Sequence, residues 1–254
     1  MTDLSTERLA SALGTRRHEF YAEITSTNDR AQVLLNENAP NGTVIIADSQ
    51  TRGRGRLGRV WLSPAGSSLM LSYLLRPPVT SIGHVGMIGA LAVAETLDAM
   101  GIKEVGIKWP NDVQIGKRKV CGVLPEVVWQ GDQLIGVILG IGINVRVDFT
   151  TSALAETAIS LSNVIPQVDR LDLLLQLLHK LDIWSAAAGS TDVFAAWHSR
   201  LNMLNAPVNV VSITANTQEM LSGVAQEVTP EGALMIRTPD GGVHRVIAGD
   251  IALG

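Results

Sequence analysis

Cysteine is almost absent from this chain of 254 residues, in which Cys121 is the single example. One thiol excludes an internal disulfide framework, and its scarcity fits a protein of the reducing cytoplasm. Aromatic residues make up only 4% of the chain, which argues against a nucleic-acid platform of stacked rings. The five histidines lack the spacing of metal ligands, and no G-x-S-x-G motif is present, so neither a zinc site nor a serine nucleophile is predicted.

Long apolar runs are also missing. Gly, Asp or Lys interrupts each run well before the roughly 20 residues needed to span a bilayer, so we expect no membrane segment. The N-terminal sequence MTDLSTERLASALG has no basic region followed by an apolar core, and we expect no signal peptide. With 46% hydrophobic residues, 17% charged residues and a formal net charge of −4, the chain is predicted to be a globular cytoplasmic protein.

Hydrophobic periodicity predicts helices and strands in one large and one small domain. Predicted helices cover residues 3–13, 26–38, 82–100, 171–184 and 193–201, and residues 151–204 as a whole are expected to be mainly helical. Strands are expected at 18–24, 41–50, 68–75, 105–109, 112–116, 119–129 and 133–145. Residues 60–64 are expected to pair with 68–75 as a hairpin. The helix at 26–38 should begin at Ser26 or Thr27 and bury Ala31, Leu34 and Leu35.

The composition changes after residue 205. Four short strands at 207–213, 219–228, 233–238 and 242–248, separated by Gly, Pro and Asn turns, predict a small all-β barrel. The sequence therefore predicts an α+β fold in two domains. Residues 1–204 would form a mixed, mainly antiparallel sheet packed with helices, and residues 205–254 would form the barrel.

The segment TRGRGRLGRVW, residues 51–61, holds four arginines and three glycines. It contains G-x-G-x-x-G, but the residues that follow do not predict a helix and no carboxylate stands about 20 positions on, so a dinucleotide site is excluded. Glycines let backbone N–H groups converge on an anion, and arginines offer paired donors to carboxylate or phosphate. We therefore predict an anion-binding loop, while a solvated surface loop and a nucleic-acid patch stay as alternatives.

Three further segments carry polar side chains at the ends of predicted strands. KWPND, residues 108–112, displays Asn111 and Asp112 in a turn, where functional residues often lie. Lys119 opens an apolar strand, in which its charge needs a partner. GIGIN, residues 140–144, ends a predicted strand. Its glycines allow another group to approach the backbone closely, and the amide of Asn144 suits the edge of a base. Each feature alone also fits a structural role, as a turn or as a lysine snorkelling at a strand end.

Taken together, these segments resemble the biotin–protein ligases. The resemblance covers STN at 26–28, SQTRGRGRLGRVWLSPAG at 49–66, KWPND, KRKVCGVLPE at 117–126, GIGIN and the small β domain. It implies a class II synthetase-like catalytic domain followed by an SH3-like barrel. It also implies that ATP, with Mg²⁺, activates biotin to biotinyl-5′-adenylate, and that biotin then passes to one lysine of a biotin carboxyl carrier domain, such as that of acetyl-CoA carboxylase.

The resemblance implies roles for the residues that match, although it implies none as a metal ligand. Trp61 and Phe149 both stay open as the ring that stacks on adenine, and Leu57 stands where some relatives have another arginine. Arg54, Arg56 and Lys119 would be catalytic. The residues that would bind biotin are Ser26, Thr27, Asn28, Gln50, Arg54, Gly55, Arg56 and Lys119. The residues that would bind ATP or the adenylate are Arg59, Trp61, Asn111 and Asn144.

Other functions stay open at this point. A lipoate–protein ligase would share the fold and the chemistry, but the arginine segment and KWPND favour biotin. A biotin-sensing regulator and a plain anion-binding regulator are the alternatives without catalysis. We expect a monomer or weak homodimer that does not bind DNA, because only about twenty residues precede STN and because residues 207–254 carry two arginines, no lysine and five carboxylates.

Overall fold

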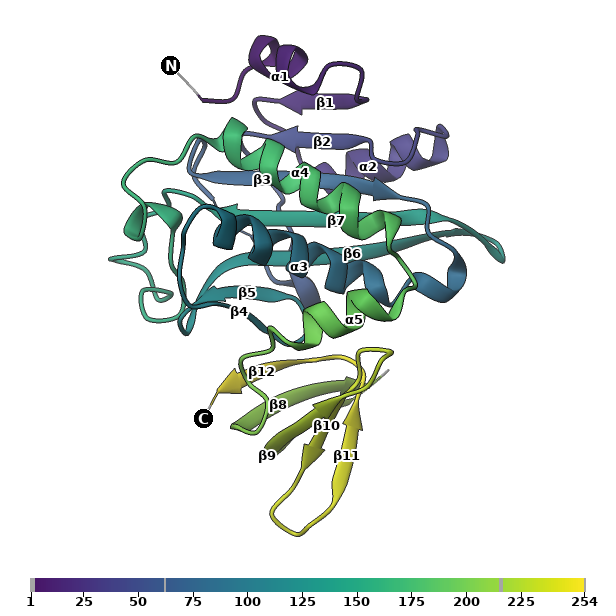
Figure 1. The fold of residues 1–254 in the computed structure, drawn as a ribbon, viewed down its shortest axis with the longest axis vertical. Coiled ribbons are helices and arrows are strands. Elements are labelled where there is room, and N and C mark those ends of the chain that lie inside the picture. Colours follow the sequence, from purple (N-terminus) through teal and green to yellow (C-terminus); the bar gives the residue numbers. More distant parts are fainter. Residues whose placement is uncertain (1–2, 62, 215–216, 254) are drawn as a thin grey trace.

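The computed structural model describes residues 3–61, 63–214 and 217–253, which form two β-sheets with helices packed on the larger one (Figure 1). The larger sheet has the strand order β1-β2-β3-β7-β6-β5-β4. Only β1 and β2 pair in parallel, and the other neighbours are antiparallel, which confirms the predicted α+β class. Its strands are β1 (His18–Tyr21), β2 (Val44–Ala47), β3 (Ser68–Leu75), β4 (Val105–Lys108), β5 (Asp112–Ile115), β6 (Arg118–Gln130) and β7 (Gln133–Asn144).

The helices cover both faces of this sheet. α3 (His84–Ala99) and α4 (Arg170–Ala186) lie side by side on one face, with α5 (Thr191–His198) against α3 and α1 (Thr6–Leu13) against α4 (Figure 1). α2 (Thr27–Asn36) covers the other face, and it buries Ala31, Leu34 and Leu35 as the spacing predicts. Three short 3₁₀ helices complete the larger part: η1 (Arg56–Gly58), η2 (Val79–Ser81) and η3 (Leu161–Asn163).

Side chains of β3 show how the two faces are separated. Leu71 and Tyr73 belong to the main core beneath α3 and α4, whereas Leu74 belongs to a second cluster beneath α2. This alternation follows from the period of two in a β-strand. Helix α3 packs closely on β6, because a Cβ added at Gly89 would lie 2.7 Å from Val123 Cγ1. The opposite face of the sheet is covered by α2 over part of its area. The rest of that face, next to the N-terminus of α2, is not covered by α3.

The second sheet begins at Pro207, just after the change in composition at residue 205. Its strand order is β11-β10-β9-β8-β12. It lies at the end of the molecule below β4, β5 and α5 in Figure 1. Four of the strands were predicted, and the fifth, at the end of the chain, was missed because only five residues follow the glycine that opens it. The strands are β8 (Pro207–Thr214), β9 (Thr217–Val228), β10 (Leu234–Arg237), β11 (Val243–Val246) and β12 (Gly249–Leu253).

Two local predictions are wrong. Residues 60–64 do not form a hairpin with β3, whose partners are β2 and β7; Leu62 lies outside the described residues. The arginine segment instead turns back on itself through Leu57 and Gly58, which have positive φ, so that Val60 bridges Arg54. Residues 151–169 contain turns and η3 and no α-helix, because local hydrogen bonds, such as that from Leu154 N to Ser152 Oγ, compete with helix formation.

No helix in the described part of the chain combines the length and the apolar character needed to cross a membrane.

Arg170, the first residue of α4, ties three segments together inside the larger domain. Its side chain is 1% exposed, and it donates hydrogen bonds to Asp3, Asp48 and the carbonyl of Ser68. Burial raises the pKa of Asp3, but the hydrogen bonds and charge of Arg170 outweigh it and lower that pKa to about 2. A buried charge without such partners is strongly destabilising. The network therefore fixes the N-terminal segment and the end of β2 to the start of α4.

We predict that Arg170→Met lowers the free energy of unfolding by about 3–5 kcal/mol, because Asp48 loses its ion pair and Asp3 keeps only Arg146 as a partner. Urea unfolding at neutral pH measures this. The control is Arg200→Met, whose partly exposed pair with Asp98 should contribute about 1 kcal/mol or less. Equal losses in the two variants would contradict a special role for Arg170.

The same network gives a pH dependence. Because the pKa of Asp3 is lower in the folded protein than its usual 3.8, the stabilisation is fully present above that value and is lost as the pH falls towards 2. In Arg170→Met this acid dependence should become smaller.

Candidate active site

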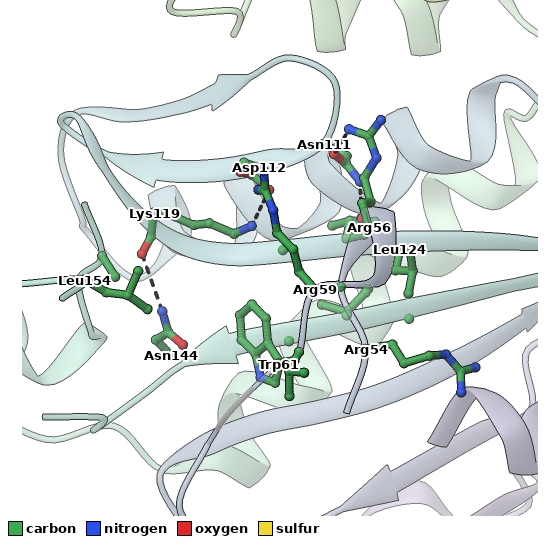
Figure 2. A pocket seen from close by; sticks show the side chains of 18 of the residues that line it. Arg54, Arg56, Arg59, Trp61, Asn111, Asp112, Lys119, Leu124, Asn144 and Leu154 are labelled. Atoms are coloured by element: carbon green, nitrogen blue, oxygen red, sulfur yellow. Dashed lines mark hydrogen bonds and ion pairs between the residues drawn. The ribbon is translucent and has the colours of Figure 1, made fainter. Parts of the chain in front are cut away.

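A cavity of about 690 Å³ opens on the larger sheet beyond the N-terminus of α2 (Figure 2). It lies on the face opposite α3, since its lining residues Gly140, Gly142 and Asn144 alternate along β7 with core residues. The structure brings together in this cavity all the residues that the sequence singles out, although their roles stay predictions. These residues are Ser26, Thr27, Asn28, Gln50, Arg54, Gly55, Arg56, Arg59, Trp61, Asn111, Lys119 and Asn144.

Two glycines form part of the cavity floor. Gly122 of β6 and Gly142 of β7 are direct cross-strand partners. A Cβ at Gly142 would lie 2.7 Å from the indole of Trp61, and one at Gly122 would lie 3.2 Å from the same ring. The indole therefore lies flush against bare backbone, and its Nε1 is shielded without a hydrogen-bond partner among the described residues. Only glycine allows a flat group to approach these two strands so closely.

Lys119 reaches the cavity because β6 contains a bulge. The register changes from Val113–Cys121 to Gln114–Lys119, so that β6 holds one extra residue, Val120. Val120 and Cys121 are both fully buried, and Lys119 is thereby turned to the same face as Gly122. A bulge commonly re-aims a side chain in this way.

The partner that the sequence requires for Lys119 is Asp112, the last residue of KWPND. Lys119 Nζ lies 2.6 Å from Asp112 Oδ1, and the two side chains point toward one another in Figure 2. Lys108 Nζ lies 3.8 Å from the second oxygen of the same carboxylate. The ammonium of Lys119 also lies 5.9 Å from the centre of the Trp61 ring. One carboxylate thus holds two lysines at the edge of the cavity.

A hydrogen-bonded cluster of neutral groups lies at the start of α2. Gln50 Oε1 accepts from the backbone N–H of Thr27 at 2.7 Å and from its hydroxyl at 3.1 Å. Ser72 of β3 donates towards Thr27 at 2.8 Å and towards Asn28 at 2.5 Å. Ser26 is the N-cap of α2, as predicted, but its side chain makes no capping hydrogen bond. Buried donors and acceptors are therefore present here for a polar, uncharged part of a ligand.

The arginines of the loop at residues 51–61 meet carboxylates of the protein itself. Arg54 lies 2.6 Å from Asp29 and 3.4 Å from Glu126, and in Figure 2 it points away from Lys119. Arg59 forms an ion pair with Asp250 of β12, and Arg56 lies 3.9 Å from the same residue. Side chains from α2, β6 and β12 therefore offset part of the positive charge of the loop before any ligand binds.

Arg56 is the least exposed of the three arginines that line the cavity. Burial lowers its pKa, and the charges of Asp250 and Asp112 offset this only in part. Its Nη1 also donates to Asn111 Oδ1 at 3.3 Å. A guanidinium held in this way has unused donors and would gain from an anion in the cavity.

Asn111 and Asn144 are 5% and 4% exposed, and both brace the cavity wall. Asn111 donates to the carbonyl of Val123, and Asn144 donates to the carbonyls of Ile159, at 3.3 Å, and Lys119. Their carbonyl oxygens leave acceptor capacity for a ligand. Phe149 lines the cavity as well as Trp61, so both aromatic candidates for adenine stacking are present.

The lone cysteine is not part of this chemistry. Cys121 is fully buried on the core face of β6, and burial raises the pKa of its thiol. A thiol without appreciable thiolate is a poor nucleophile. Within the described residues, no group of three His, Cys, Asp or Glu side chains could hold a metal by itself.

Several features of the cavity were not assigned from the sequence. The pairing of Gly122 with Gly142 depends on strand register, which no local motif reveals. Asp112 was noted as displayed in a turn, but its pairing with Lys119 was not foreseen. No local sequence pattern marked Asp250 as a cavity residue, since it lies in a different sheet, about 190 residues along the chain from the arginines that it contacts.

Comparison with known proteins places this cavity in a family. A family model described as the biotin/lipoate A/B protein ligase family matches residues 20–144. The bifunctional ligase/repressor BirA of Bacillus subtilis is 34% identical over 248 residues, covering 94% of this chain and 74% of that protein. The chain belongs to the biotin/lipoate protein ligase family.

A solved structure extends this likeness to the fold of both sheets. The biotin protein ligase of Aquifex aeolicus in complex with biotin and ATP has a TM-score of 0.76 and 27% identity, with coverage of 94% of this chain and 98% of that one. The biotin–[acetyl-CoA-carboxylase] ligase of Paracoccus denitrificans is 29% identical over 234 residues, covering 87% of this chain and 94% of that one. Membership of the ligase family thus includes the C-terminal sheet.

We predict that residues 51–59 exchange their amide hydrogens faster in the free protein than with biotin or biotinyl-adenylate bound. Glycine entropy and the incompletely offset charge of Arg56 oppose order until an anion is bound. Hydrogen exchange followed by mass spectrometry measures this, with β3 as the internal reference. Equal protection of residues 51–59 in both states would show that the loop is already fixed.

Proposed function

We propose that the protein is an ATP-dependent biotin–protein ligase. It forms biotinyl-5′-adenylate and pyrophosphate from biotin and ATP, and it then transfers biotin to a lysine of a biotin carboxyl carrier domain. The observation that carries the proposal is a single cavity in which four cations, Arg54, Arg56, Arg59 and Lys119, lie beside a neutral polar cluster and a glycine floor. The names of the relatives, which include ligases for acetyl-CoA carboxylase, agree with it.

The activation step explains why so many cations are needed. The carboxylate oxygen of biotin forms a bond to the α-phosphorus of ATP, and the bond from that phosphorus to the pyrophosphate oxygen breaks. Two anions must approach one another, and the leaving group gains charge. In our assignment Arg54 and Arg56 bind the carboxylate and the phosphate, and Lys119 bridges the two. Cations fixed in a shielded site stabilise such charge at no further cost of reorganisation.

The neutral cluster is the proposed site of the biotin head. A ureido group offers one carbonyl and two N–H groups, which match the hydroxyls of Ser26 and Thr27 and the amides of Asn28 and Gln50 in kind. These groups lie next to Gly140, where a Cβ would be 2.6 Å from Asn28 Oδ1. The apolar part of the ligand would then extend along the sheet towards the cations. Arg59, Trp61, Asn111 and Asn144 are assigned to the nucleotide.

The residues present also suit Mg²⁺, which this activity is expected to use. Mg²⁺ is commonly held by one or two carboxylates together with substrate phosphates. The carboxylates that line the cavity in the described residues are Asp112 and Asp250. Asp112, beside Lys119, is the better candidate ligand. When bound, the ion would offset phosphate charge.

In the transfer step the amine of the carrier lysine attacks the activated carbonyl of biotin, and AMP leaves with the electrons of the bond that breaks. A thioester on this chain would need an accessible thiolate, and Cys121 offers none. We therefore assign a direct transfer. The partners are the biotin carboxyl carrier domains of biotin-dependent carboxylases, and the assembly is proposed to be a monomer or weak homodimer.

The two sheets also support a division of the chain into a catalytic domain of residues 1–204 and a small SH3-like domain of residues 205–254. Asn205 has a positive φ, which fits a turn between them.

Incubation with labelled ATP and biotin should give biotinyl-adenylate and pyrophosphate, and the same reaction with lipoate should not. We predict that Lys119→Ala slows adenylate formation about a hundredfold or more, because the ammonium acts on charge that develops in the transition state. Its free energy of unfolding should change little. Lys103→Ala, an exposed lysine outside the cavity, is the control and should retain full activity.

The outcomes separate the competing functions. Adenylate from lipoate alone would indicate a lipoate ligase, and binding of biotin without any adenylate would indicate a sensor. Normal turnover in a strongly destabilised Lys119→Ala would show that this lysine is structural.

We also predict that this chain does not bind DNA specifically. Residues 207–254 have a formal charge of −3, from two arginines and five carboxylates, whereas phosphate contacts supply most of the affinity for duplex DNA. The loop arginines should be engaged by carboxylate and phosphate once ligands are bound. A mobility-shift assay at about 150 mM salt, with biotin and a biotin-operon promoter fragment, measures this. A saturable complex that survives competitor DNA would contradict it.

A further inference from the structure

The C-terminal sheet places one carboxylate inside the proposed active site. Asp250 of β12 lines the cavity, and its side chain is 24% exposed. It pairs with Arg59 and lies 3.9 Å from Arg56. The proposed function assigns Arg56 to the carboxylate and the phosphate, and Arg59 to the nucleotide.

Two hydrogen bonds fix β12 and its neighbours at this place. Lys108 Nζ donates to the carbonyl of Ile251 at 3.2 Å, next to Asp250 in the chain. Trp109, which is 1% exposed, donates through Nε1 to the carbonyl of Gly232 at 2.8 Å. Both donors belong to KWPND. The second sheet therefore contacts the arginine loop on one side of the cavity and KWPND on the other.

We propose that Asp250 is a positioning residue that acts as an intramolecular substitute for the phosphate of the nucleotide. In the free protein it holds Arg56 and Arg59 at the cavity, and it gives them up when phosphate binds. The proposal rests on the proposed function and deepens it, because it makes the C-terminal sheet a determinant of the affinity for ATP and pyrophosphate.

The charges favour an exchange of partners over a permanent pair. Asp250 brings one negative charge to two guanidinium groups, whereas pyrophosphate or the triphosphate of ATP brings several. Asp250 Oδ2 is shielded, and it forms its ion pair with Arg59 Nη2. Phosphate oxygens accept paired hydrogen bonds from arginine. A polyanion therefore offers these arginines more negative charge and more hydrogen-bond acceptors than Asp250 does.

The consequence for affinity follows from linkage. An interaction that exists in the free protein and is lost on binding lowers the affinity of the ligand by its own free energy. Arg54 pairs with two carboxylates, Asp29 and Glu126. These residues belong to α2 and to β6 of the larger sheet. Among the described residues of the second sheet, Asp250 is the one that forms ion pairs with Arg56 and Arg59.

Asp250→Asn keeps the size of the side chain and removes its charge. Titration calorimetry with inorganic pyrophosphate, without added Mg²⁺ and at low ionic strength, should show binding about two- to fivefold tighter than in the unchanged protein, the range for a partly exposed ion pair. In the free variant, residues 51–59 should exchange amide hydrogens faster, and saturating pyrophosphate should remove the difference. Glu227→Gln, an exposed change of equal charge on β9, should leave both measurements unchanged.

A double-mutant cycle with Arg59→Gln tests whether Asp250→Asn changes pyrophosphate affinity through Arg59. In the Arg59→Gln background, the gain from Asp250→Asn should shrink, because the main partner of Asp250 is absent. Weaker or unchanged pyrophosphate binding in Asp250→Asn overturns the inference, as does a full gain that persists without Arg59. Failure of the unchanged protein to form adenylate would reject the proposed function instead, and the pyrophosphate measurements would still decide the role of Asp250.

Discussion

Mutual repulsion of like charges is the constraint on which the cavity depends. Four arginines lie within eight residues of a glycine-rich segment, and such a segment has neither the side-chain packing nor the backbone preference to hold them together. The structure offsets Arg54, Arg56 and Arg59 with carboxylates from three separate elements, α2, β6 and β12. These elements are far apart in the chain, and they meet at the loop only in the folded protein. The geometry of the loop is therefore a product of the whole fold and not of its own sequence.

Strand alternation supplies the rest of the geometry. Because β6 and β7 send alternate residues to α3 and to the cavity, the same two strands build the core with Val123, Leu139 and Ile141 and the cavity floor with Gly122 and Gly142. The bulge in β6 then brings Lys119 to the cavity face. Cavity geometry and core packing are thus two faces of one hydrogen-bonded ladder, which fixes Lys119 on a regular strand.

The sequence predicted those parts of the molecule that local patterns determine. Helix α2 and its buried face follow from the spacing of Ala31, Leu34 and Leu35, and the strands of the larger sheet follow from apolar runs between turn residues. The predicted site residues come from continuous segments of the sequence, and they line one cavity. The hairpin at residues 60–64 failed because Val60 and Trp61 have the composition of a strand, whereas their partners are set by the turn at Leu57 and Gly58. Asp250 and the register of Gly122 with Gly142 depend on contacts that are remote in the chain, and no local pattern encodes them.

Burial distinguishes the two arginine networks of this protein, one inside the larger domain and one at the cavity. Arg170 is 1% exposed and is hydrogen-bonded to two carboxylates and a carbonyl, so every partner is internal and none can be exchanged without leaving a shielded charge unpaired. The side chains of Arg54 and Arg59 are 39% and 67% exposed, and water can replace their partners at little cost. Arg56 lies between these cases, partly shielded and incompletely paired. The same chemical pair, guanidinium and carboxylate, thus fixes the fold where it is sealed from solvent and remains free to exchange its anion where it borders the cavity.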